Sequence, residues 1–137
     1  MRISQAQARD RFGAARVARL ATADAAGAPH LVPVVFAVLG DEVGIAVDHK
    51  PKRSTALKRL RNVEENPAVS LLADHYEDDW SRLWWVRADG IGAVRAAADR
   101  PDLIDALVAK YPQYRQRRPD SGLLVVDVRT WRGWAAA

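Results

Sequence analysis

The sequence predicts a mainly β, α+β protein in which short strands form a small antiparallel barrel or sandwich. Six short apolar segments have strand character, three segments have helical periodicity, and the two kinds of element do not alternate regularly. The missing alternation argues against a doubly wound parallel sheet. The chain has 137 residues, the usual length of one domain, so we expect residues 1–137 to form a single unit around one core.

The first half of the chain predicts one helix and three strands. Ser4 can cap a short amphipathic helix that runs to about Ala15. Segment 30–39 is apolar on both faces and is expected to be covered on both sides. Pro33 within it has no N–H to donate, so it should lie at a bulge or at a sheet edge. The predicted strands, which together form a meander, are 17–23, 30–39 and 43–47.

The second half predicts two further helices. Segment 54–66 places Leu57, Leu60 and Val63 on one stripe, which is typical of a surface helix. Another helix opens with an Asp and a Pro and covers about 99–111. The remaining predicted strands are 68–73, 83–94 and 122–128.

Composition narrows the possible chemistry. The chain has no cysteine, which excludes thiol nucleophiles, disulfides and iron–sulfur clusters. Its three histidines have no metal-ligand spacing, so no metal site is predicted. The net charge of +4 favours an anionic partner: nucleic acid, a membrane surface or a phosphorylated small molecule. No apolar run could span a membrane and the first residues are polar, so we expect a cytoplasmic protein.

The densest group of chemically useful side chains directly precedes the second predicted helix. Lys50, Lys52 and Arg53 supply three cations there, and Ser54 and Thr55 supply hydroxyl groups in the first turn. A helix start has free N–H groups and a dipole that favours negative charge. These residues predict a phosphate site, and the alternative is a solvated basic loop with an ordinary serine cap.

A second group of interest is rich in tryptophan. Strand alternation puts Trp85, Arg87 and Asp89 on one face and Trp84 and Val86 on the other. Because these two tryptophans cannot fill the same core, one of them should cover a ligand or a partner subunit. The alternative is that both are core residues. Docking onto a second subunit is also expected of the two tryptophans near the C-terminus, Trp131 and Trp134.

Motifs for several reaction types are missing. The sequence has no phosphate-binding glycine loop, no serine in a nucleophile elbow and no carboxylate pair suited to glycoside hydrolysis. We therefore assign no catalytic acid or base. If the protein is an enzyme, a cofactor should carry the reaction.

Five motifs occur in one order along nearly the whole chain. They are Ala18-Arg19-Leu20-Ala21-Thr22, Gly27-x-Pro29-His30-x-Val32-Pro33-Val34, Lys52-Arg53, Asn66-Pro67-Ala68-Val69-Ser70-Leu71-Leu72 and Val86-Arg87-Ala88-Asp89-Gly90. In this order they resemble the flavin and deazaflavin oxidoreductases of the pyridoxamine-phosphate-oxidase-like superfamily. Segments 48–53, 78–87 and 131–134 look like an actinobacterial subgroup classed as coenzyme F420-dependent.

The resemblance implies an FMN-binding type of split β-barrel with about six strands and peripheral helices. It implies a homodimer with two cofactor sites at the subunit interface. In this family a basic pair before the helix holds the cofactor phosphate, which corresponds to Lys52 and Arg53. A strand residue that faces the ring corresponds to Trp85, and the backbone along the ring corresponds to the region of Pro33 and Val34.

The implied function is F420-dependent hydride transfer to or from a small organic substrate. Lys50 adds charge beyond what one phosphate requires, which suits the glutamate tail of F420. Two alternatives keep the same site: an FMN-dependent oxidoreductase and a non-catalytic deazaflavin carrier. A nucleic-acid-binding module is disfavoured because the cations concentrate at one helix start, and neither nucleic acid nor a membrane is expected as a partner. The expected cofactor-binding residues are Pro33, Val34, Lys50, Lys52, Arg53, Ser54, Thr55, Trp85 and Arg87.

Overall fold

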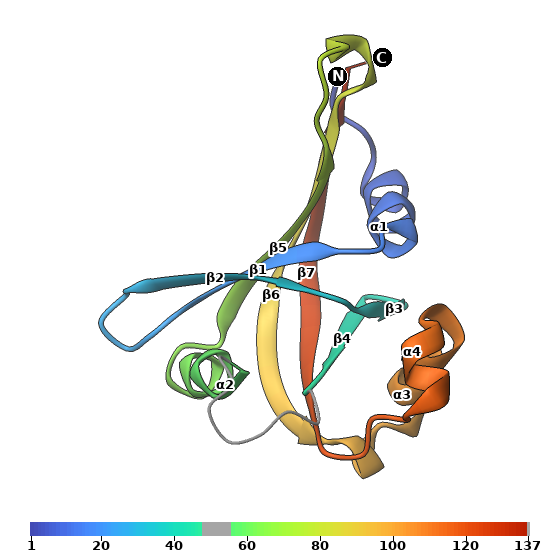
Figure 1. Cartoon of the computed structure of the whole chain (residues 1–137). Helices are drawn as coiled ribbons and strands as arrows, with labels where there is room; N and C mark the ends of the chain where they lie inside the picture. The colour runs from blue at the N-terminus through green and yellow to red at the C-terminus, as the bar shows by residue number, and fades with distance from the viewer. Residues whose placement is uncertain (48–55, 137) are drawn as a thin grey trace.

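A computed structural model describes residues 1–47 and 56–136, whose strands form one seven-stranded antiparallel sheet (Figure 1). The strand order is β2-β1-β5-β6-β7-β4-β3, so β2 and β3 are the two edges. This confirms the predicted mainly β fold with an open, split barrel. The strands are β1 (Ala18–Ala23), β2 (Pro29–Val34), β3 (Ala37–Leu39), β4 (Glu42–Ala46), β5 (Ala68–His75), β6 (Trp84–Ala96) and β7 (Gly122–Ala135).

Helices pack around this sheet. Ser4 caps the first helix as predicted, because its hydroxyl accepts a hydrogen bond from the Gln7 N–H and the Gln7 side chain accepts one from the Ser4 N–H. The third helix is confirmed, and a short fourth helix was not predicted. The α-helices are α1 (Gln5–Ala14), α2 (Ala56–Glu65), α3 (Pro101–Lys110) and α4 (Pro112–Gln116), and the 3-10 helices are η1 (Trp80–Arg82) and η2 (Ala97–Asp99).

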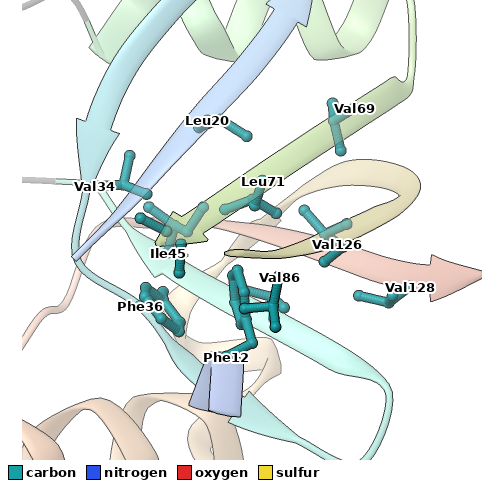
Figure 2. Close-up of a cluster of buried hydrophobic side chains, with 14 of the residues drawn as sticks. Phe12, Leu20, Val34, Phe36, Ile45, Val69, Leu71, Val86, Val126 and Val128 are labelled. Carbon is teal, nitrogen blue, oxygen red and sulfur yellow. The ribbon is translucent and has the colours of Figure 1, made fainter. Parts of the chain in front are cut away.

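The main core lies between the curled sheet and α1, where side chains from all parts of the barrel converge (Figure 2). The Phe12 ring lies tilted against Phe36 with ring centroids 4.6 Å apart and makes a T-shaped contact with Trp131 at 5.5 Å. Trp131 is only 5% exposed, and its indole N–H donates to Asp41 at 2.9 Å. The expectation that Trp131 docks onto a second subunit is therefore wrong, because this residue is part of the core.

The predicted strand 30–39 is divided into β2 and β3. The Tyr111 hydroxyl accepts a hydrogen bond from the Phe36 N–H at 3.1 Å and lies 3.0 Å from the Phe36 carbonyl, so a side chain replaces the strand ladder at this residue. Both pairings of the predicted meander are present, because β1 pairs with β2 and β3 pairs with β4, but the break in strand 30–39 places the two pairs at opposite edges of the sheet. Pro33 lies on an edge strand as predicted, but Leu31 on that strand is 67% exposed and is not covered on both sides.

Strand β7 extends seven residues beyond the predicted end at Val128 and pairs with β6 along its length. A register shift at Asp89 and Gly90 divides this pairing into two halves. The upper halves of β5, β6 and β7 form an arm, and both chain termini lie at its tip (Figure 1). None of the helices among the described residues is long and apolar enough to cross a membrane.

Candidate functional site

The outer face of the sheet, opposite the main core, carries a continuous row of side chains. Register partners in an antiparallel sheet point to the same face. A row that crosses five strands therefore contains Pro33, Arg19, Leu72, Arg87 and Arg132. Three of these five side chains are cationic, so this row is positively charged, whereas Asp74 and Asp89 in the neighbouring rows of the same face are acidic.

The predicted alternation along β6 is confirmed. Val86 and Ala88 are fully buried in the core, whereas Trp85 and Arg87 lie on the outer face. Trp84 packs against the core side, where the Arg11 guanidinium lies 5.2 Å from its ring centroid. One of the two adjacent tryptophans is therefore free to cover a ligand or a partner subunit.

Trp85 borders a hollow of about 550 Å³ over β1, β2 and β5. Its walls are mainly apolar, and Leu31 and Tyr76 within it are 67% and 62% exposed. Arg19 and Arg87 add two positive charges to this apolar hollow, and Asp74 adds one negative charge. Organic cofactor sites have volumes of about 300–1,000 Å³ and combine apolar walls with a few polar groups, so the hollow fits a conjugated ring with an anionic substituent.

Arg87 is held in place by its neighbours on the outer face. Its Nε donates to both oxygens of Asp89, at 2.9 and 3.0 Å. The Ser70 hydroxyl donates to the same carboxylate at 2.7 Å, which fixes the carboxylate in turn. Because only Nε is used, both Nη groups of Arg87 are without a hydrogen bond to the part of the chain that the structure describes. A guanidinium held in this way is well suited to bind a ligand oxygen.

Pro33 and Val34 line a different, smaller hollow of about 270 Å³, next to Ile45 and Arg59. The side chain of Val34 is buried, and that of Pro33 is exposed at the outer face. Along the row, Pro33 is three strand spacings from Arg87, or roughly 14 Å. Within one chain, the structure thus divides the predicted ring-contacting residues between two hollows.

The predicted phosphate-binding residues Lys50, Lys52, Arg53, Ser54 and Thr55 lie outside the described residues. Their part in the site stays a prediction from the sequence.

A third hollow, also about 550 Å³, was missed in the sequence because β7 was predicted too short. Its walls include Arg2, Arg87 and Arg132 together with Trp85 and Trp134, and we call it the arginine hollow. Continuing the alternation of Leu124, Val126 and Val128 would have placed Arg132 and Trp134 on the core face. The register shift opposite Asp89 and Gly90 reverses the alternation and turns both residues outward, and no local pattern in the sequence reveals this.

The open seven-stranded sheet with its peripheral helices defines the class of split β-barrel proteins. Residues 4–135 match the family described as pyridoxamine 5'-phosphate oxidase, and the chain belongs to that family. No functionally curated protein matches the sequence.

Solved structures of the same fold are distant in sequence. A FAD-binding protein from Mesorhizobium loti is 19% identical, with a TM-score of 0.72 over 97% of this chain and 95% of that one. A conserved hypothetical protein from Mycobacterium tuberculosis is 21% identical, with a TM-score of 0.74 over 98% and 86%. HutZ, the heme storage protein from Vibrio cholerae, is 18% identical, with a TM-score of 0.67 over 93% and 92%.

Proposed function

We propose that this protein is an oxidoreductase that binds the deazaflavin coenzyme F420 and acts on a small organic substrate. The observation that carries the proposal is the apolar hollow beside Trp85 and Arg87 in a member of this family. The bound deazaflavin would supply the hydride chemistry, which no side chain of the protein can provide.

The residues of the chain would bind and orient the reactants. Trp85 would cover one face of the ring and exclude water from it, and Arg87, fixed by Asp89, would supply a positive charge at the edge. Lys52 and Arg53 would hold the phosphate, as the sequence predicts. The preference for F420 depends on the subgroup resemblance and on the extra cation at Lys50.

We further propose a homodimer in which each cofactor lies between two subunits. The hollow at Pro33 and Val34 and the hollow at Trp85 and Arg87 are separate within one chain. A second copy placed on the outer face would bring the hollow at Pro33 and Val34 of one subunit toward the hollow at Trp85 and Arg87 of the other. It would also cover Leu31, which is 67% exposed.

Two other functions use the same fold. The similar protein binds a flavin, FAD, which supports an FMN-dependent enzyme. FMN and F420 share a conjugated ring system and a phosphate, so the same site suits either cofactor. The similarity to the heme storage protein HutZ supports a carrier that binds the deazaflavin without turnover.

Titration of the purified dimer with F420 and with FMN tests the proposal. We expect quenching of tryptophan fluorescence by F420 at a lower concentration than by FMN, and weaker binding of both cofactors by Trp85→Ala. Trp80→Ala is the matched control, because Trp80 is 76% exposed and does not line the hollows described here. Tight FMN binding without F420 binding would identify the flavin enzyme, and F420 binding without reduction of any tested substrate would favour the carrier.

The choice between the two cofactors can be tested at Lys50. Lys50→Ala should weaken F420 binding by about 0.5–2 kcal/mol and leave FMN binding nearly unchanged, since only F420 has an anionic tail. Lys58→Ala removes the same charge from α2 and serves as the control. Equal losses for both cofactors would show that Lys50 binds the shared phosphate, and the preference for F420 would then have no support from this residue.

A further inference from the structure

The arginine hollow places like charges opposite one another. Arg87 and Arg132 are direct register partners in the β6–β7 ladder, and Trp85 and Trp134 form the next pair on the same face. A β-bridge joins Arg2 to Trp134, which brings a third guanidinium to the same hollow. Like charges directly opposite each other destabilise a sheet, so this arrangement has a cost for the isolated chain.

The carboxylates of the chain do not compensate for this charge. Asp89 pairs with Arg87 through Nε. Within residues 1–47 and 56–136, Arg2 and Arg132 form no ion pair and no side-chain hydrogen bond, and both are exposed. By contrast, Arg129, three residues before Arg132 on β7, pairs with Asp127 at 3.0 Å. The hollow therefore has an excess of about two positive charges.

The donors and walls of the hollow indicate the chemistry of its ligand. Guanidinium groups bind carboxylate and phosphate oxygens through paired N–H donors, and Arg87 is already oriented with both Nη groups available. The two indole rings provide apolar walls that suit the ring or chain that carries such an anion. A volume of about 550 Å³ is sufficient for a small organic molecule and larger than a single inorganic anion needs.

We propose that the arginine hollow binds the carboxylate or phosphate group of a small organic anion whose carbon skeleton lies against Trp85 and Trp134. Trp85 borders both the arginine hollow and the apolar hollow proposed for the cofactor, so the anion would lie next to the cofactor ring. That the anion is the substrate rests on the proposed function. Binding of the anion itself does not require the cofactor.

Calorimetric titration of the cofactor-free protein tests this site, with benzoate, phenyl phosphate and the neutral analogue benzyl alcohol as probes. We expect one or both anions to bind in the millimolar range or tighter, and benzyl alcohol to bind much more weakly. The tighter of the two anions shows whether the site prefers a carboxylate or a phosphate.

Substitutions locate the site. Arg132→Gln and Arg2→Gln should each weaken binding of the preferred anion about tenfold, which corresponds to about 1.4 kcal/mol. Arg129→Gln is the control, because it removes the same charge from the same strand outside the hollow. Its affinity should stay within about twofold of the wild-type value.

Three results would overturn the inference: no binding of either anion, equal binding of benzyl alcohol, or the same loss of affinity in all three variants. F420 is titrated in parallel on the wild-type protein. Anion binding without F420 binding would support this site while removing the proposed function, and F420 binding without anion binding would overturn this inference alone.

Discussion

At the scale of single residues, the most unusual environment belongs to Lys110 at the end of α3. Its ammonium group donates to the carbonyls of Gly13 and Ala15, at 3.1 and 2.7 Å, and so binds the last turn of α1. The same group lies 3.9 Å from the centroid of the Phe36 ring. Burial, with a smaller contribution from the nearby charge of Arg16, lowers the pKa of Lys110 to about 8.

This pKa predicts an increase of stability with pH. Between about pH 8 and pH 10.5 the unfolded chain binds a proton at Lys110 that the folded chain has lost, so the free energy of unfolding should rise with pH in this window. Because the group is only half-buried, we expect a rise of at most about 2 kcal/mol. Urea unfolding between pH 7.5 and 10 measures this rise as the difference in the free energy of unfolding between the wild type and Lys110→Met.

A second group in the same cluster, Tyr111, has the opposite effect on stability at the upper end of this pH range. Burial raises the pKa of the Tyr111 hydroxyl above its ordinary value of 10.0, so the folded chain keeps a proton that the unfolded chain loses. This effect lowers stability above about pH 10 and is present in both proteins. A wild-type protein whose stability follows that of Lys110→Met across the whole range would show that Lys110 titrates normally.

At the scale of elements, the β6–β7 pairing depends on a close backbone approach at Gly90. A Cβ atom there would collide with the Asp127 carbonyl and would lie 2.9 Å from the Val128 Cα. Since backbone atoms cannot move aside as a flexible side chain can, Gly90→Ala should destabilise the protein by about 3 kcal/mol. The midpoint of urea unfolding reports the change.

Gly13→Ala is the control for this prediction. Gly13 lies in α1, where the nearest atom to an added Cβ is 3.7 Å away, and alanine favours a helix over glycine by about 1 kcal/mol. This substitution should leave the stability unchanged or raise it. A Gly90→Ala protein as stable as Gly13→Ala would mean that the register shift tolerates a side chain.

The elements show why the sequence predicts some features and not others. Strand alternation and the Ser4 cap are local patterns, and both are confirmed. The break between β2 and β3 depends on the Tyr111 hydroxyl, 75 positions away in the sequence, which no local pattern reveals. The length of β7 depends on pairing with β6, and a prediction that ended at Val128 could not place Arg132 in the outer-face row.

At the scale of the whole molecule, the two faces of the sheet differ in how well they are covered. The inner face is closed by α1 and the main core, and α3 covers the outer face over β3 and β4. Over β1, β2 and β5 the outer face leaves Leu31 and Leu72 67% and 37% exposed between arginines. An exposed apolar patch bordered by charged residues marks an interaction surface. The proposed cofactor position on this face makes a second copy of the chain the expected partner.

We therefore expect a mass of about twice 15.1 kDa by light scattering at micromolar concentration, with an interface above roughly 2,000 Å². Leu72→Glu places a charge in the row between Arg19 and Arg87, on the outer face and away from the core. It should yield a folded monomer with the circular dichroism of the wild type, and cofactor binding should be lost with the dimer. Leu39→Glu is the control, because Leu39 is equally exposed at 37% but lies on β3 at the opposite edge of the sheet from β2. A monomeric wild type, or a Leu72→Glu protein that remains dimeric, would show that the outer face is not the subunit interface.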